Sequence, residues 1–250
     1  MGGCTINVWW PGNRKESPEE CAQRTLALVK GLIELDPLFS TFETTSRRRG
    51  KYVDDALPLD VDGLARLFSK GVNRSSVNRT VKKELGFRLI TTTSGKGSVM
   101  LRVHGGVYDS PYNNNACVLD LPSQGPVTER LVNAPMIERI LRLMVDAFEP
   151  EDGKAGEFEF WDAMEPDRES RWERAVNWMM YFSRACGSVP PLPAPVRIEP
   201  VSDKGMLVIL SPEPVVASNP EHLALGRRVR ALLKKAGVLD PPLPETRRST

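Results

Sequence analysis

Few side chains in this sequence have the spacing that catalysis requires. His104 and His222 lie far apart, and neither has a second metal-ligating residue at the spacing of a metal site. A strand predicted to end at His104 could present a general base there, but a hydrogen-bonded structural histidine is the simpler interpretation. Residues 95–98, Gly-Lys-Gly-Ser, are predicted to join two strands, so no helix N-terminus would face a phosphate at that loop.

An acid-x-lysine pair, Asp152 and Lys154, is the one arrangement that resembles a nuclease centre. Nucleases use clustered carboxylates and a lysine to hold Mg²⁺ and a water molecule. The pair surrounds Gly153 just after a predicted helix that ends near Pro150, so a solvated turn is the favoured interpretation. We therefore expect a non-enzyme with no catalytic residue, no metal and no cofactor.

The four cysteines, Cys4, Cys21, Cys117 and Cys186, are too widely spaced for a zinc or redox motif. Cys21 falls in a predicted helix and Cys117 in a predicted strand. We interpret all four as small buried hydrophobic residues in a reducing compartment.

A strongly acidic segment suggests binding chemistry instead. Residues 149–173 contain ten acidic residues against three basic ones, and residues 157–161 alternate as Glu-Phe-Glu-Phe-Trp. As a strand, this alternation would turn Phe158 and Phe160 to the core and Trp161 outward among carboxylates, which suits a basic protein surface. The alternative is an edge strand protected by charge. The candidate contact residues are Glu157, Glu159, Trp161, Asp162, Glu165, Asp167 and Glu169.

A basic segment supports a different function. Residues 66–102 carry nine Lys or Arg residues and one acid, Glu84. Helices predicted over 60–70 and 75–85, joined by a turn at 71–74, give residues 59–87 a helix-turn-helix outline. The second helix would present Arg79 and Lys82 to DNA. A DNA-binding regulator is therefore the alternative hypothesis, against packing helices with a solvated basic face.

The elements that would position these residues begin with a strand over 5–10 and a helix that starts after Ser17. Pro18 suits the first helical position and Glu20 completes a capping box with Ser17. Further helices are predicted over 136–148, 172–180 and 220–236, the last capped by Asn219 and stopped by Gly237. Further strands are predicted over 87–93, 99–103, 116–121, 157–161, 196–199 and 206–210.

This order of elements predicts an α/β (α+β) fold with one mixed, mainly antiparallel sheet and helices packed on it. We expect residues 1–239 to form a single domain, because the strands after the proline-rich segment 190–195 are too few for a second sheet. Residues 240–250 are basic and proline-rich, and we expect a disordered tail. Residues 39–58, which contain the basic segment 47–51, are predicted to be an exposed excursion.

Composition is that of an ordinary globular protein: 40% hydrophobic residues, 26% charged residues and a formal net charge of +2. No apolar stretch approaches the about 18 residues of a membrane span, and the N-terminus does not resemble a signal peptide. We therefore expect a soluble, cytoplasmic protein with no membrane partner.

Several short segments, in this order along the chain, resemble the immunity protein 52 family of bacterial polymorphic toxin systems. They are Trp9-Trp10-Pro11, the helix start at 16–21, 36–39 (Asp-Pro-Leu-Phe), 85–87 (Leu-Gly-Phe), 146–150 (Asp-Ala-Phe-Glu-Pro), Trp178 with Tyr181, 205–208 (Gly-Met-Leu-Val) and 219–222 (Asn-Pro-Glu-His). The segments 47–51 and 190–195 have no counterpart in the resemblance.

The resemblance implies a protein that binds and neutralises a cognate toxin, typically one with a restriction-endonuclease-like nuclease domain, during competition between bacteria. It implies no catalytic residues. The partner expected from it is the toxin, not nucleic acid. The choice of the acidic segment as the contact surface rests on its charge and not on the family.

Overall fold

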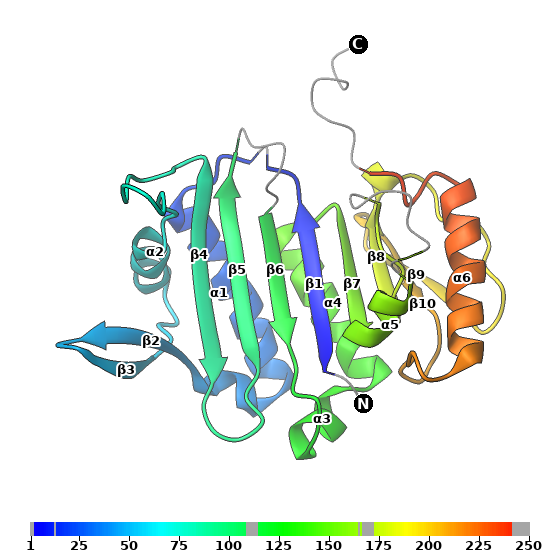
Figure 1. Cartoon of the computed structure of the whole chain (residues 1–250), viewed down its shortest axis with the longest axis horizontal. Helices are drawn as coiled ribbons and strands as arrows, with labels where there is room; N and C mark the ends of the chain where they lie inside the picture. The colour runs from blue at the N-terminus through cyan, green and yellow to red at the C-terminus, as the bar shows by residue number, and fades with distance from the viewer. Residues whose placement is uncertain (1–2, 13, 109–114, 165, 167–172, 242–250) are drawn as a thin grey trace, which may run out of the picture.

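The computed structural model describes residues 3–12, 14–108, 115–164, 166 and 173–241. Ten strands form one sheet in the order β3-β2-β4-β5-β6-β1-β7-β8-β10-β9 (Figure 1). The strands are β1 (Cys4–Trp10), β2 (Phe42–Arg48), β3 (Lys51–Ala56), β4 (Leu85–Thr93), β5 (Met100–Val107), β6 (Asn115–Asp120), β7 (Asp152–Glu157), β8 (Met179–Ser183), β9 (Arg197–Val201) and β10 (Gly205–Ile209). The helices are α1 (Pro18–Leu35), α2 (Val61–Lys70), α3 (Pro126–Leu131), α4 (Ala134–Phe148), α5 (Phe158–Met164) and α6 (Pro220–Lys235), with short 3-10 helices at Pro37–Thr41 and Arg184–Cys186.

Every pairing between neighbouring strands of this sheet is antiparallel. The predicted α+β class, with one mainly antiparallel sheet and helices packed on it, is therefore confirmed. The sheet was expected to be mixed, and no pairing between its ten strands is parallel. β9 and β10 follow the proline-rich segment 190–195 and belong to the same sheet, because β10 pairs with β8 and β9 pairs with β10. This continuity favours a single domain over 1–239, which stays a prediction.

The opening strand and helix form as their residues predict. β1 alternates buried and half-buried residues along its length, as a strand with one face on the core does. Ser17 caps α1: its hydroxyl accepts from the Glu20 backbone N–H, and the Glu20 carboxylate accepts from the Ser17 N–H at 2.7 Å. The capping box predicted from the sequence is thus confirmed.

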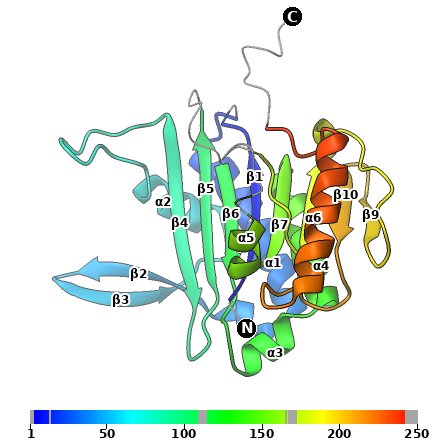
Figure 2. The same cartoon turned by 45° about the vertical axis from the view of Figure 1, so that its right-hand side comes forward.

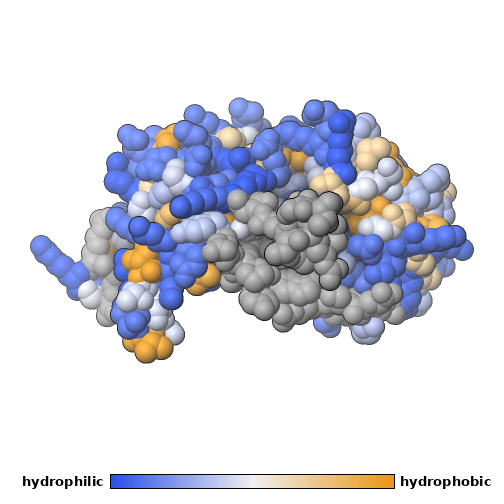
Figure 3. All heavy atoms as spheres, turned by 90° about the horizontal axis from the view of Figure 1, so that it is seen from above, coloured by the Kyte–Doolittle hydropathy of each residue, from blue (hydrophilic) through white to orange (hydrophobic). Residues whose placement is uncertain are grey.

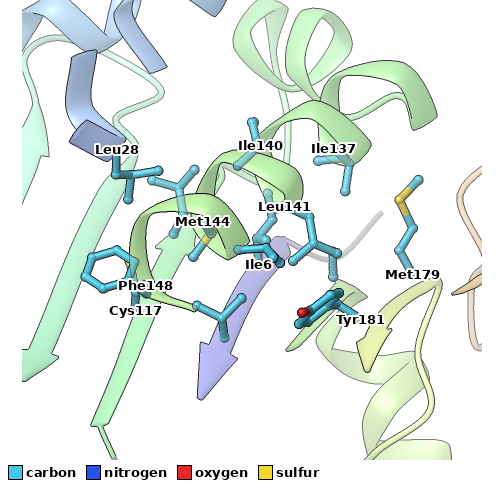
Figure 4. Packing of buried hydrophobic residues seen from close by; sticks show 14 of the residues in the cluster. Ile6, Leu28, Cys117, Ile137, Ile140, Leu141, Met144, Phe148, Met179 and Tyr181 are labelled. Atoms are coloured by element: carbon cyan, nitrogen blue, oxygen red, sulfur yellow. The ribbon is translucent and has the colours of Figure 1, made fainter. Parts of the chain in front are cut away.

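The main core lies between one face of the sheet and the helices α1 and α4. Figure 4 shows the apolar side of α4, with Ile137, Ile140, Leu141 and Met144, directed at Ile6 of β1 and at neighbouring strands. At the end of α4, Phe148 stacks on Trp10 with ring centroids 5.0 Å apart. The predicted apolar stripe over 136–148 therefore faces the sheet, as expected.

The opposite face of the sheet is covered unevenly. α5 and α6 lie over its β7–β8–β10 end (Figures 1 and 2), where a Cβ on Gly226 of α6 would come within 2.9 Å of the Phe160 ring. Over β4 and β5 the same face presents exposed side chains, among them Ile90 and Met100. The two ends of the sheet thus have different surroundings.

The predicted second helix of the helix-turn-helix outline, over 75–85, is wrong. Residues 71–84 form an irregular loop in which Ser75 N–H donates to the Thr80 carbonyl, and Arg79 has a left-handed backbone with φ of 60°. Short polar side chains bond the backbone locally: Ser75 Oγ accepts from Val77 N–H, and Asn78 Oδ1 accepts from Thr80 N–H. Such bonds compete with helical ones. Val77, which would have supplied an apolar face, is 91% exposed.

The predicted helix over 172–180 is also wrong. Residues 179–183 form β8, a strand in the interior of the sheet with buried residues on both faces. Apolar residues on both faces remove the alternation that distinguishes a strand from a helix. Trp172, at the start of that prediction, lies outside the described residues.

The C-terminal helix is confirmed. Asn219 caps α6 by accepting from the Glu221 N–H at 2.9 Å, and Gly237 follows the helix with φ of +75°. Ordered structure continues to Asp240, whose carbonyl accepts from Arg174. Of the predicted disordered tail, residues 242–250 lie outside the described residues.

Candidate functional site

The predicted strand over 157–161 is wrong, because β7 ends at Glu157 and α5 begins at Phe158. The buried side chains of this segment are Phe160 and Met164, four residues apart, as on one side of a helix. Both contact α6 at Gly226, whose absent side chain lets the two helices approach. Five alternating residues are compatible with a strand or with a turn of helix. Packing of Phe160 and Met164 against α6 favours the helix.

The helical conformation changes which aromatic residue is exposed. Phe158, predicted to face the core, is 55% exposed, and Phe160 is buried as predicted. Trp161, predicted to face outward, is half-buried and contacts Phe158 edge-to-face with ring centroids 5.2 Å apart. Phe158 is therefore the exposed aromatic residue that the sequence pattern failed to identify.

Lys154 packs against the ring of Trp161. It lies in β7, only 7% exposed, with its Nζ 3.6 Å from the centroid of the Trp161 ring and 5.3 Å from that of Trp9 in β1. An ammonium group over an aromatic face is attracted to the ring, more strongly when it is desolvated. The lysine thus holds Trp161, and with it α5, against the sheet.

The structure brings four of the predicted residues together: Glu157 at the end of β7, and Glu159, Trp161 and Asp162 on α5. Glu159 and Asp162 are exposed, and Glu157 is half-buried. We call these four residues together with Phe158 the α5 surface. Glu165, Asp167 and Glu169 lie outside the described residues. Figure 2 shows α5 standing in front of the sheet.

The Asp152–Lys154 pair is not the solvated turn that the sequence suggested. Both residues lie in β7, and Asp152 Oδ2 accepts from Arg174 Nε at 3.2 Å. Burial of its carboxyl raises the pKa of Asp152 to about 6. Over the described part of the chain no three His, Cys, Asp or Glu residues cluster as metal ligands. Asp152 is therefore engaged in an ion pair with Arg174, and Lys154 contacts the ring of Trp161.

His104 is held as a structural histidine. Its Nε2 donates to the Leu85 carbonyl oxygen at 2.9 Å and lies 3.3 Å from the Asn73 amide nitrogen. Burial lowers the pKa of His104. The ring therefore joins β5 to the start of β4 and to the 71–84 loop. His222 is engaged similarly, since its Nδ1 accepts from the Val216 N–H at 3.0 Å.

All four cysteines are free thiols and buried, as the sequence predicted. Burial raises the pKa of Cys21 to about 12 and that of Cys186 to about 11. Both thiols are therefore protonated near neutral pH, and neither has the low pKa of a reactive cysteine.

A polar depression at the start of α1 is a feature that sequence reasoning missed. It is lined by Arg14, Lys15, Glu16, Glu20, Gln23 and Arg24. Arg24 Nε lies 2.9 Å from Glu16 Oε1, and Arg14 Nη1 donates to the Phe148 carbonyl at 2.9 Å. These contacts join the start of α1 to the end of α4. We therefore assign these side chains a structural role.

Comparison with known proteins adds the family. The family model for immunity protein 52 matches residues 5–242. No curated protein sequence matches. Among solved structures, the Pseudomonas aeruginosa T6SS protein PA0821 has a similar fold, with a TM-score of 0.59 at 15% identity over 94% of this chain and 74% of that one.

No helix in the described part of the chain is long and apolar enough to cross a membrane. The match to the family model covers nearly the whole chain, from β1 to the residues after α6, and includes every element that builds the α5 surface. The chain belongs to the immunity protein 52 family.

Proposed function

We propose that this protein neutralises a cognate toxin by stoichiometric occlusion, and that the toxin carries a restriction-endonuclease-like nuclease domain. Membership of an immunity protein family supports the first part. The structural neighbour is a T6SS protein, which fits a function in competition between bacteria. The nuclease part is supported by charge: a nuclease presents a basic groove to phosphates, and an acidic surface complements it.

The observation that carries the proposal is the composition of the α5 surface. Exposed carboxylates of Glu159 and Asp162 flank an exposed phenyl ring, Phe158. Charge steers a basic partner, and a buried aromatic ring provides most of the energy at a typical hot spot. The acidic residues that follow, Glu165, Asp167 and Glu169, extend the proposed surface by sequence.

The required affinity is compatible with a surface of this size. Because one escaped nuclease can kill the cell, we expect a Kd of about 1 nM or tighter, equivalent to about −12 kcal/mol. A standard interface buries about 800 Å² on each partner. That is well under a tenth of the 13045 Å² of accessible surface here. No catalytic group is needed, and we propose that the protein acts without catalysis.

The test is co-expression with the product of the adjacent toxin-like gene, scored by cell survival and by co-purification. Rescue with a stable complex supports an immunity protein. The absence of both rescue and a stable complex would contradict the proposed function.

The interface is tested separately with purified complex. We expect Glu159→Lys combined with Asp162→Lys to weaken binding at least about 100-fold, and Phe158→Ala by at least about 30-fold, the loss at a hot-spot residue. The charge effect should grow as salt is lowered. Glu34→Lys combined with Glu213→Lys, two exposed acids elsewhere with the same charge change, is the control. Wild-type affinity in the α5 variants would leave the proposed function intact and would assign the interface to another surface.

A further inference from the structure

The β2–β3 hairpin leaves the body of the protein. β2 pairs with β3 at six positions but with β4 at only two, Phe42 with Thr93 and Glu43 with Thr92. Figures 1 and 2 show the rest of the hairpin projecting past the edge of the sheet. Seen from above in Figure 3, hydrophilic side chains extend to this same end of the molecule. We call residues 44–55 the arm.

The arm makes few packing contacts with the rest of the protein. No residue described in β3 is buried, and Tyr52 at its tip is 77% exposed. Its turn is well formed, because Arg49 and Gly50 both have positive φ, at 48° and 83°, as a two-residue hairpin turn requires. A two-stranded hairpin alone is only marginally stable in water, so a third strand would stabilise it.

The alternation of backbone bonds identifies the groups on its free edge. Leu57 N–H donates to the Phe42 carbonyl at 2.8 Å, and hydrogen-bonded pairs recur at every second position of an antiparallel ladder. By that alternation Val53 and Asp55 turn their backbone groups toward β2. Tyr52, Asp54 and Ala56 turn theirs to the free edge, and all three residues are exposed.

The other edge of the sheet, β9, is protected against a further strand. Pro200 has no N–H to donate, and its carbonyl oxygen accepts from Arg142 at 2.9 Å. Arg197 and Glu199 of the same strand form ion pairs with each other and with α4. β3 has no proline and keeps its outward backbone groups accessible, so the β3 edge is the one available for pairing.

We propose that β3 pairs antiparallel with β3 of a second copy of this chain, with the twofold axis at Val53. In this register Tyr52 is opposite Asp54 of the second copy, and the two outward-facing residues can exchange both backbone bonds. Lys51 is then opposite Asp55 of the second copy, twice by symmetry. The strand is therefore complementary in charge to itself, and two sheets join through the arms.

Neighbouring registers are less favourable. An axis at Asp54 would place that carboxylate opposite its own copy, and like charges directly opposite destabilise a strand pair. An axis at Tyr52 would leave Lys51 opposite Val53 and lose both charge pairs. A shift by a single residue would place outward backbone groups opposite inward ones. Charge and backbone direction thus select the axis at Val53.

The first test uses cysteine cross-linking under mild oxidation. All four native cysteines are buried, so an introduced thiol is the reactive one. Val53→Cys would place two thiols opposite each other at a non-hydrogen-bonded pair, where Cβ atoms are about 4.5–5.5 Å apart. We expect it to form a disulfide-linked dimer much faster than Val77→Cys, a more exposed valine on the 71–84 loop. Equal rates for the two variants would overturn the proposal.

The second test is a charge exchange followed by sedimentation equilibrium. Lys51→Glu and Asp55→Lys should each weaken the dimer about tenfold, and the double variant should restore it, because opposite charges would again face each other across the twofold axis. Matching far-UV circular dichroism and unfolding midpoints show that the variants are folded. A wild-type protein that stays monomeric up to about 1 mM would overturn the proposal. So would a dimer indifferent to these changes, or arm variants that weaken only toxin binding and thereby assign the arm to the toxin.

Discussion

The two ends of the ten-stranded sheet are built in opposite ways. At the β7–β8–β10–β9 end, α5 and α6 cover one face, α4 packs on the other, and charged side chains are paired inside the fold. Arg174 is 5% exposed there and contacts the carboxylates of both Glu151 and Asp152. At the other end, the β2–β3 arm projects with no buried residue described in β3 and a cluster of basic residues at its tip.

The difference shows how one sheet can carry two kinds of surface. At the enclosed end, Phe160 and Lys154 contact neighbouring elements and fix the orientation of α5, and with it the exposed side chains of the α5 surface. At the open end, a local turn determines the shape of the arm, and the structure leaves its backbone edge free. Substitutions at the enclosed end should therefore cost stability, whereas those in the arm should change association and leave stability nearly unaltered.

The largest effect is expected for Arg174→Ala. This change would remove the guanidinium that pairs with the carboxylates of Glu151 and Asp152, and removing one partner of a buried ion pair costs about 3–5 kcal/mol. It would also weaken the attachment of the C-terminal segment, since the guanidinium that the change removes donates to the carbonyl oxygens of Val238 and Asp240. Urea unfolding measures the loss.

Arg197→Ala is the matched control, because Arg197 makes ion pairs with Glu138 and Glu199 at a half-exposed position of β9. Exposed pairs contribute about 0–1 kcal/mol, so the control should lose less than about 1 kcal/mol. Equal losses for the two variants would contradict the contrast between buried and surface ion pairs.

A smaller effect is expected for Lys154→Met, which keeps the length of the side chain and removes its charge. The cation contacts Trp161 and Trp9, and a desolvated contact of this kind contributes about 2 kcal/mol. We expect unfolding at lower urea and a change in tryptophan fluorescence of the folded protein. A variant as stable as the wild type would show that packing alone holds α5.

The contribution of His104 in β5 to the free energy of unfolding is expected to depend on pH. Burial lowers the pKa of His104, so the unfolded chain takes up this proton first as the pH falls. The contribution of His104 to stability is then fully present above its unfolded pKa of about 6.5 and decreases as the pH falls toward the folded value. The difference in unfolding free energy between wild type and His104→Gln should shrink between about pH 7.5 and about pH 5.5, on either side of that unfolded pKa. A constant difference would contradict a buried neutral imidazole.

The smallest effect on stability is expected for Tyr52→Ser in the arm. The tyrosine is 77% exposed, and surface substitutions away from special features change stability by less than about 0.5 kcal/mol. Thermal unfolding at low protein concentration measures this change. A loss above about 1 kcal/mol, beyond the range of ordinary surface substitutions, would mean that the arm packs on the body and would remove the contrast between the two ends.

The sequence was sufficient to propose most residues of the α5 surface but not to predict their conformation. The acidic character of residues 157–162 is a property of composition, so Glu157, Glu159 and Asp162 could be proposed from the sequence. Their conformation was not found, because five alternating residues match a strand as well as one turn of helix. The exposed Phe158 was therefore assigned to the core, and the role of Lys154 under Trp161 depends on a contact between two different elements.

What the sequence by itself determined are the features whose causes are local. The capping box at Ser17, the stop at Gly237 and the apolar stripe of α4 depend on residues within a few positions of one another, and each formed as predicted. The antiparallel α+β class followed from the order of such elements. What only the tertiary structure decided are the features that depend on distant neighbours: β8 is a strand because it lies between β7 and β10, and α5 is a helix because Gly226 of α6 leaves room for Phe160. Local preferences at these places are weak, so the packing free energy of remote residues selects the conformation.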